Sequence, residues 1–208
     1  MPTPSVGGNR TIGDPELTAA DRAALLRLAR ATLAAHLAGR PLPPIPNVPG
    51  AALRRGAFVT LTQGGALRGC IGHIADERPL GDVVREMAVA AARDDPRFAP
   101  VAPDELPDLA LEISVLLPAA PLATTPIDPS RIVVGRDGLI VHRGRHVGLL
   151  LPQVATEYHW EPEAFLAATC RKAGLPPHAW REPDTEVLVF QADVFGETGE
   201  GGRGKGAG

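Results

Sequence analysis

The residue with the clearest chemical potential in this sequence is Cys70, which lies in the run LRGCIG at 67–72. Gly69 and Gly72 flank it, and their missing side chains would let another backbone or a ligand come close to the thiol. In a regular strand Arg68, Cys70 and Gly72 share one face. A guanidinium on that face would favour the thiolate and lower the pKa of Cys70. The run therefore predicts a thiol activated by Arg68.

His73 is the nearest base in the sequence, but the same alternation places its imidazole on the opposite face of the strand. Only a bulge at Gly69 or Gly72 would bring His73 and Cys70 together. A second interpretation makes Cys70 a small buried hydrophobic residue, as most single cysteines of cytosolic proteins are. The strand by itself favours this passive role.

Three polar residues outside the run are further candidates. Glu112 and Ser114 share one face of a mostly apolar strand, and a buried carboxylate there needs a partner, for which Arg68 is the first choice. Arg97, in the run DPRF at 95–98, could hold an anionic substrate, because a guanidinium fork suits carboxylate and phosphate. The alternative for DPRF is a turn that ends a helix and forms a local ion pair between Asp95 and Arg97.

Metal and cofactor sites have little support in this sequence. His142 and His146 bracket a short turn and could face each other across a hairpin, but no third ligand accompanies them. A phosphate-binding glycine loop is also missing. We therefore expect no metal and no cofactor.

Hydrophobic patterns along the chain predict the elements that position these residues. Helices are expected at 18–39, 80–91 and 162–174, and strands at 57–61, 67–74, 109–117, 132–134, 139–141, 147–151 and 186–194. The proline-rich stretch 41–49 predicts an extended surface strap that adds no apolar burial to the core. Together they predict an α+β fold with a mostly antiparallel sheet flanked by helices and a smaller second subdomain.

Composition limits the cellular setting and the partners. The 208 residues carry a net charge of −3, which gives no general attraction to nucleic acid or anionic lipid. No apolar run could span a membrane, and the two cysteines have no CxxC spacing, so we expect a cytoplasmic protein with free thiols. We predict a disordered N-terminus at 1–16, one domain of two closely packed subdomains at 17–195, and a disordered glycine-rich tail at 196–208.

Five motifs in a fixed order resemble the AMMECR domain family, whose prokaryotic members are also labelled protein A of the AmmeMemoRadiSam system. They are FVTL at 58–61, LRGCIG at 67–72, DPRF at 95–98, EISVL at 112–116 and LPQV at 151–154. The resemblance implies a two-part α+β fold with LRGCIG as its functional centre, but no established reaction. It also implies association with a Memo-like protein and a radical S-adenosylmethionine protein. The family often has a histidine where this chain has Asp137.

Two functions follow from these observations. In the first, Cys70 is a nucleophile or carries a modification, Arg68 activates it and Glu112 orients the reacting groups. Arg97 then binds the substrate, and the positions that line its site are Gly69, Gly72 and Ser114. In the second, the chain is a non-catalytic adaptor that presents the glycine-flanked strand and the strap at 41–49 to partner proteins. The sequence leaves both open.

Overall fold

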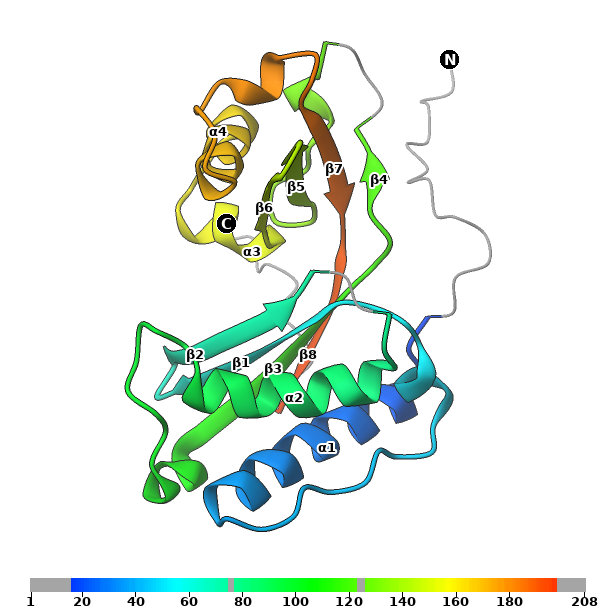
Figure 1. The fold of residues 1–208 in the computed structure, drawn as a ribbon, viewed down its shortest axis with the longest axis vertical. Helices are drawn as coiled ribbons and strands as arrows, with labels where there is room; N and C mark the ends of the chain where they lie inside the picture. Colours follow the sequence, from blue (N-terminus) through cyan, green and yellow to red (C-terminus); the bar gives the residue numbers. More distant parts are fainter. Residues whose placement is uncertain (1–15, 75–76, 123–125, 198–208) are drawn as a thin grey trace, which may run out of the picture.

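The computed structural model describes residues 16–74, 77–122 and 126–197. The first of its two sheets has the strand order β2-β1-β3-β8, with every neighbouring pair antiparallel. Its strands are β1 (Ala57–Gln63), β2 (Ala66–His73), β3 (Leu109–Leu116) and β8 (Ala192–Gly196). Helices α1 (Ala19–Leu37) and α2 (Leu80–Arg93) lie side by side under one face of this sheet (Figure 1).

Apolar residues at alternate positions hold this sheet to its helices. Val59 and Leu61 of β1 and Ile113 of β3 are fully buried in the same core as Leu25 of α1 and Val84 of α2. Helix α1 begins as its sequence predicts, because the side chains of Thr18 and Asp21 form a capping box. The sheet therefore has one face sealed by helices, and its other face is available for a site.

The second sheet has the strand order β4-β7-β5-β6 and is also antiparallel. Its strands are β4 (Ala120–Pro121), β5 (Gly138–Arg143), β6 (His146–Leu150) and β7 (Glu186–Phe190). Helix α4 (Pro162–Lys172) packs against β5 and β6, and the short helix α3 (Pro152–Glu157) precedes it. Four short 3-10 turns complete the described elements, η1 (Pro49–Ala52), η2 (Pro103–Asp108), η3 (Pro129–Arg131) and η4 (Ala179–Arg181).

Two paired strand segments run from one sheet into the other. The chain passes from β3 to β4 and returns from β7 to β8, with β3 paired to β8 and β4 paired to β7. Between the sheets the N–H of Leu117 donates to the carbonyl of Gln191 at 2.8 Å, so the pairing is maintained across the crossing. A separate apolar cluster joins the two sheets, with Leu116 and Phe58 from the first and Phe190 from the second.

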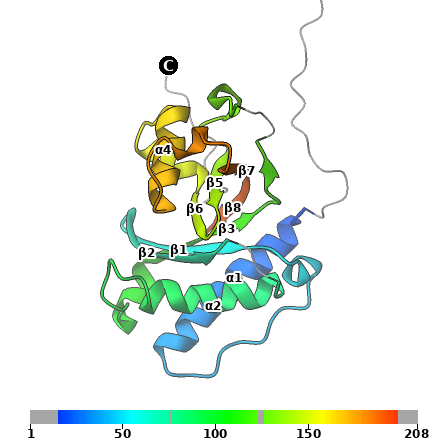
Figure 2. The same cartoon turned by 45° about the horizontal axis from the view of Figure 1, so that its top comes forward.

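The layers follow one another in a simple order, which Figure 2 shows from a tilted view. Helices α1 and α2 come first, then the first sheet, then the second sheet with α4. We call the face of the first sheet that is turned away from α1 and α2 the inter-sheet face. Within the described residues, no helix combines the length and apolar character needed to cross a membrane.

The predicted α+β fold class is confirmed, while several boundaries differ. The predicted strand at 186–194 is two strands, β7 and β8, separated at Gln191, and the run 132–134 lies outside any strand. The predicted start of the tail at 196 falls inside β8, and the N–H of Glu197 still donates to Leu111. Most of the predicted disordered ends, 1–15 and 198–208, lie outside the described residues.

The strap at 41–49 is extended, as its prolines predict, but it does contribute to the core. Ile45 and Val48 are partly buried against the α1–α2 core. Gly81 of α2 leaves the room for this contact, because a Cβ there would lie 2.5 Å from the side chain of Ile45. The expectation that this stretch adds no apolar burial is therefore wrong.

Candidate functional site

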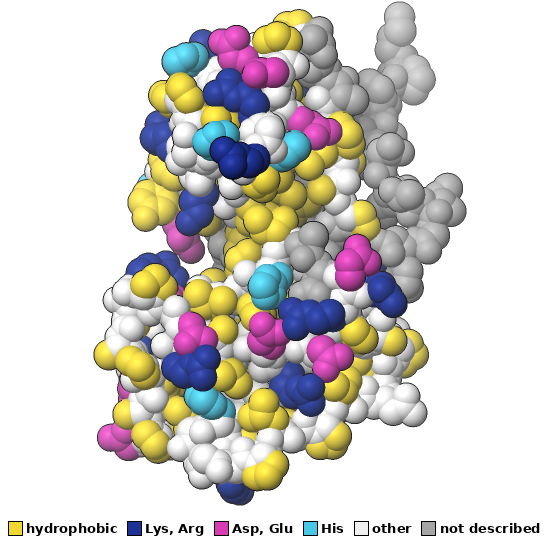
Figure 3. All heavy atoms as spheres, viewed as in Figure 1, with side chains coloured by type: hydrophobic (Ala, Val, Ile, Leu, Met, Phe, Trp, Pro, Cys, Tyr) yellow, Lys and Arg dark blue, Asp and Glu magenta, His cyan; other side chains and the backbone are white. Residues whose placement is uncertain are grey.

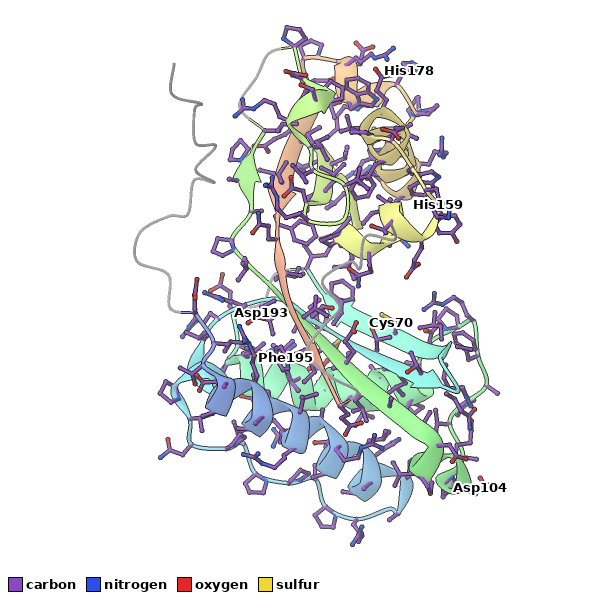
Figure 4. All side chains as sticks on the ribbon, turned by 180° about the vertical axis from the view of Figure 1, so that it is seen from behind. Cys70, Asp104, His159, His178, Asp193 and Phe195 are labelled. Carbon is purple, nitrogen blue, oxygen red and sulfur yellow. The ribbon has the colours of Figure 1, made fainter. Side chains whose placement is uncertain are left out.

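Cys70 lies in a row of polar side chains across three strands of the first sheet. Thr60 of β1 is paired with Cys70 of β2 on one side and with Glu112 of β3 on the other. Directly paired residues share a face, so all three side chains lie on the inter-sheet face. Seen from behind in Figure 4, Cys70 stands on the side of the first sheet that is turned toward the second. The space-filling view shows a notch between the two lobes at the left edge of the molecule (Figure 3).

The two glycines that flank Cys70 serve packing within the protein. Gly69 faces α2, where a Cβ would lie 2.1 Å from the carbonyl oxygen of Ala91, so its small size lets the helix approach the sheet. Gly72 lies on the inter-sheet face, but a Cβ there would lie 2.3 Å from the ring of Phe58. The ring of Phe58 therefore occupies the space that was predicted for a ligand at Gly72, and α2 occupies the space at Gly69.

The sulfur of Cys70 is half-buried and accepts a hydrogen bond from Thr60, whose Oγ1 lies 3.2 Å from Sγ. Burial raises the pKa of this thiol, and the nearby carboxylates of Asp95 and Glu112 raise it further. The hydrogen bond from Thr60 and the charge of Arg97 act in the opposite direction but do not outweigh burial. The predicted lowering of the pKa is therefore wrong, because these surroundings favour the protonated thiol.

Arg68 is not the cation that faces this thiol. The pairing of β1 with β2 shifts by one residue between Leu61 and Thr62, so regular alternation does not continue through Arg68. Its Nε and Nη2 donate to the two carboxylate oxygens of Glu105 at 2.7 and 2.9 Å, and its Nη1 donates to the carbonyl of Ala99 at 3.0 Å. The expected pairing of Arg68 with Glu112 is wrong, because Glu105 of η2 occupies its fork.

For the DPRF run, the sequence left open a local ion pair between Asp95 and Arg97 or an Arg97 that binds an anion, and the structure is compatible with both. They form the local ion pair, with Arg97 Nη2 2.7 Å from Asp95 Oδ2. Asp95 also accepts the backbone N–H of Cys70 at 2.8 Å, and the charge of Arg97 acts on the sulfur. The side chain of Arg97 is 54% exposed, and its Nη1 has no hydrogen bond within the described part of the chain. This nitrogen could therefore bind an anionic group.

Glu112 is a half-buried carboxyl on the same row. Burial raises its pKa, and Glu157 at the end of α3 raises it further, so the second sheet also contributes a charge to this site. Ser114 is 1% exposed, and its hydroxyl has no hydrogen-bond partner within the described residues. Ser114 is paired with Phe58, two residues along β3 from Glu112, so it lies on the same inter-sheet face.

The histidines lie apart from the thiol. His73 is paired with the core residue Ala57, so it lies on the opposite face from Cys70, and its Nε2 is 3.8 Å from Glu86 of α2. His142 lies 3.7 Å from Glu186, whereas His146 faces the carbonyl of Ala173 from the other side of the second sheet. They do not face each other. In the described ranges, no three His, Cys, Asp or Glu side chains are grouped to hold a metal ion.

Asp137, at the position where the family often has a histidine, has a structural role. It is 1% exposed and accepts bonds from the side chain of Arg136 and from the backbone N–H of Val133. A hollow of about 470 Å³ lies elsewhere, on α2. Its charged residues pair with one another, as Arg85 does with Asp82. Neither Asp137 nor the hollow on α2 is a better candidate for the functional site than the surroundings of Cys70.

The described chain is an α+β protein of two antiparallel sheets with a thiol on the face between them. A model of the AMMECR1 family matches residues 26–195, so the chain belongs to that family. A protein of Methanothermobacter thermautotrophicus is 51% identical over 84% of this chain and 93% of its own length. A protein of Thermococcus gammatolerans is 47% identical over 83% of this chain and 88% of its own length. The crystal structure of an uncharacterized protein from Pyrococcus horikoshii matches with a TM-score of 0.79 and 43% identity, covering 86% of this chain and 92% of that one.

Sequence reasoning did not identify Thr60 or Glu157 as part of the site around Cys70. The alternation in AFVTLTQ at 57–63 does contain a signal for Thr60, because polar residues alternate with buried Val59 and Leu61. Glu157 carries no comparable signal, since it approaches the row only through the packing of the second sheet on the first. The bond from Cys70 to Asp95 likewise requires knowledge of where the segment after α2 returns.

Proposed function

We propose that this protein is an enzyme in which the thiol of Cys70 attacks the carbonyl carbon of an anionic substrate at the inter-sheet face. The observation that supports this most directly is the row Cys70, Thr60 and Glu112, with a hydrogen bond of 3.2 Å between the hydroxyl and the sulfur. A nucleophile, a hydroxyl next to it and a carboxyl on one rigid sheet are the parts that general-base activation requires.

Glu112 is the base in this proposal. A protonated thiol must lose its proton when it reacts, and a carboxylate with a raised pKa accepts a proton more readily than an ordinary one. In the resting structure the hydroxyl of Thr60 donates to the sulfur, so the relay requires this hydroxyl to rotate. It then accepts the proton of the thiol and passes its own proton to Glu112. The sulfur forms its bond to the carbonyl carbon while the carbonyl electron pair moves to oxygen. When that pair returns, the leaving group departs and takes the proton back from Glu112.

Arg97 selects the substrate. Its Nη1, which bonds to none of the described residues, offers a donor for a carboxylate or phosphate, and its charge acts on the sulfur. The exposed part of the guanidinium is open to solvent, so a small anionic molecule can approach it. The substrate class is therefore a carbonyl compound that carries a negative group.

Acyl transfer from two small thioesters tests this function. Succinyl-N-acetylcysteamine carries a free carboxylate, and butyryl-N-acetylcysteamine is its neutral counterpart. We expect the mass of the intact protein to increase by one acyl group at Cys70, faster with the succinyl thioester. The Glu112→Gln variant should slow transfer from both thioesters, and Arg97→Gln should remove the preference for succinyl. Arg136→Gln is the matched control, because Asp137 holds Arg136 in the turn before β5 as Asp95 holds Arg97. No acylation of Cys70 by either thioester would reject the proposal.

We further propose that the protein acts in the cytoplasm together with a Memo-like protein and a radical S-adenosylmethionine protein. The resemblance to the AmmeMemoRadiSam system supports the partners, and two free thiols located in different parts of the fold support a reducing compartment. Co-purification of tagged protein with each partner, expressed together, tests the association. Recovery of neither partner from a cell extract at low salt would count against it.

A non-catalytic adaptor is the second candidate, and one observation favours it. The thiol of Cys70 has a raised pKa and already accepts a hydrogen bond, as expected of a passive residue. An adaptor requires that Cys70→Ser leave partner binding intact, whereas the enzyme requires that it abolish acyl transfer. The two measurements on this one variant separate the candidates.

A further inference from the structure

Asp95 connects the backbone of Cys70 to the side chain of Arg97. Its carboxylate is buried, with 4% exposure for the residue, and it accepts four hydrogen bonds. The N–H of Cys70 donates to Oδ2 at 2.8 Å, and the N–H of Arg97 donates to Oδ1 at 3.1 Å. Arg97 adds Nε at 2.9 Å and Nη2 at 2.7 Å. Because β2 is an edge strand, Asp95 satisfies an N–H that no neighbouring strand could reach.

A similar arrangement without a reactive group lies in the turn just before β5 of the second sheet. Asp137 accepts Nε and Nη2 of Arg136 at 2.7 and 2.8 Å, and it accepts the backbone N–H of Val133 at 2.9 Å. Among the described residues, both places thus join a buried aspartate to the guanidinium of a nearby arginine and to backbone N–H groups, two at Asp95 and one at Asp137. Asp137 also accepts the side-chain amide of Gln191 at 3.4 Å. A cysteine is a backbone donor only at Asp95.

We propose that Asp95 is a positioning residue of the Cys70 site, which fixes the guanidinium of Arg97 and the backbone of Cys70 in one rigid unit. The inference rests on the proposed function in one respect, that Cys70 reacts as a thiolate. The charge of Asp95 itself opposes a thiolate, so its benefit must come through Arg97, whose bidentate geometry it sets. A guanidinium held in place stabilises the developing negative charge on sulfur without reorganising at the moment of reaction.

A double-mutant cycle on the ionisation of Cys70 tests this role. The readout is the pH midpoint of thiolate absorbance in the ultraviolet, with Cys70→Ser as the blank. Arg97→Gln should raise this midpoint by ~0.5–1 pH unit in the otherwise unchanged protein, as expected on losing a nearby opposite charge. In the Asp95→Asn background the same substitution should leave the midpoint unchanged, because Arg97 is no longer held near the sulfur. Equal shifts in both backgrounds would overturn the proposal.

Two further variants keep the test decisive if Asp95→Asn folds poorly. Arg97→Lys keeps the charge but cannot form the two-nitrogen bond to Asp95, so its midpoint should rise toward that of Arg97→Gln. A midpoint equal to that of the unchanged protein would show that charge alone matters and would overturn the proposal. Asp137→Asn is the structural control, which should lower the melting temperature and leave the midpoint of Cys70 in place.

The outcome is separable from that of the proposed function. The thiolate midpoint is measured without any substrate, so a coupled shift in the cycle can be found even if no thioester acylates Cys70. That result would retain Asp95 as a positioning residue and reject acyl transfer. Acylation with additive shifts would retain the enzyme and reject the role of Asp95.

Discussion

The two cysteines of this chain have the same direction of pKa shift and very different surroundings. Burial raises the pKa of both thiols. Cys170 is fully buried on α4, in the core of the second sheet with Phe165 and Leu166. Cys70 is half-buried and has the hydroxyl of Thr60 at its sulfur.

The direction of the pKa shift therefore does not separate the two cysteines. Both thiols are poor nucleophiles at neutral pH until a base removes the proton. Arginine charges act on both thiols, from Arg97 at Cys70 and from Arg143 and Arg171 at Cys170. Cys70 differs in that it is partly exposed and shares a sheet face with the carboxyl of Glu112. Access and a neighbouring base, which the inter-sheet face provides, are therefore the features that distinguish the two sites.

The largest expected effect is on chemical labelling. A limiting amount of iodoacetamide should label Cys70 at least ~100-fold faster than Cys170 under native conditions, because Cys170 reacts only after an opening that costs a few kcal/mol. Peptide mass spectrometry over time measures the two rates, and denatured protein provides the control in which both react alike. If Cys170 reacts as fast, or Cys70 reacts only after unfolding, the adaptor becomes the better interpretation.

The second effect is on stability. Replacing Cys170 by serine buries a hydroxyl among apolar side chains, where the backbone of Trp180 is a hydrogen-bond partner, and should lower the free energy of unfolding by about 1–3 kcal/mol. Cys70→Ser should change it by less than about 0.5 kcal/mol, because the site is partly exposed and Thr60 can bond to a hydroxyl. Urea unfolding of both variants measures the difference. A larger loss for Cys70→Ser would mean that Cys70 is mainly a packing residue.

Much of this comparison could be predicted from sequence, because the patterns that place Cys70 on a strand and Cys170 on a helix are local. The face that Cys70 occupies could not. A two-residue turn at Gly64 and Gly65 with regular pairing would set Thr60 against Gly69 and send Cys70 toward α2. The shift at Arg68 pairs Thr60 with Cys70 instead and turns the thiol to the inter-sheet face.

The charged partners were predicted less well than the fold for a similar reason. Proximity in sequence predicts that Arg68 acts on the thiol, and an assumed strand pairing predicts that it bonds to Glu112. In the structure the guanidinium of Arg68 donates to Glu105 of η2 instead. The place where the segment 94–108 returns to the edge of β2 depends on tertiary packing. Sequence therefore identified Cys70, Glu112 and Arg97, but it missed Thr60 and Glu157 and did not show which charged residues pair.

A smaller effect follows for Arg68. Arg68→Ala should change the rate at which iodoacetamide labels Cys70 by less than about twofold, because its charge is compensated by Glu105 and does not contribute to the thiol pKa. Arg97→Ala, assayed in parallel, should slow labelling more, since its charge does lower that pKa. A stronger effect for Arg68→Ala than for Arg97→Ala would restore Arg68 as the activating cation.

The last expected effect concerns Glu112 and separates its charge from its role as a base. Its folded pKa is raised, so the stability that it contributes is present at low pH and is lost as the pH rises through that value. Glu112→Gln should therefore increase stability near neutral pH relative to the unchanged protein and flatten this part of the stability profile. Thermal unfolding at acidic and neutral pH measures both.

The same variant should make Cys70 slightly more reactive toward iodoacetamide, while Cys170 is unaffected. The charge of Glu112 raises the thiol pKa, so its removal increases the thiolate fraction, by about two- to threefold at neutral pH. Acyl transfer, which needs the base, should fall at the same time. If labelling and transfer both fall, Glu112 supports the structure of the site, and if neither changes, its carboxylate lies too far from the sulfur to act on it.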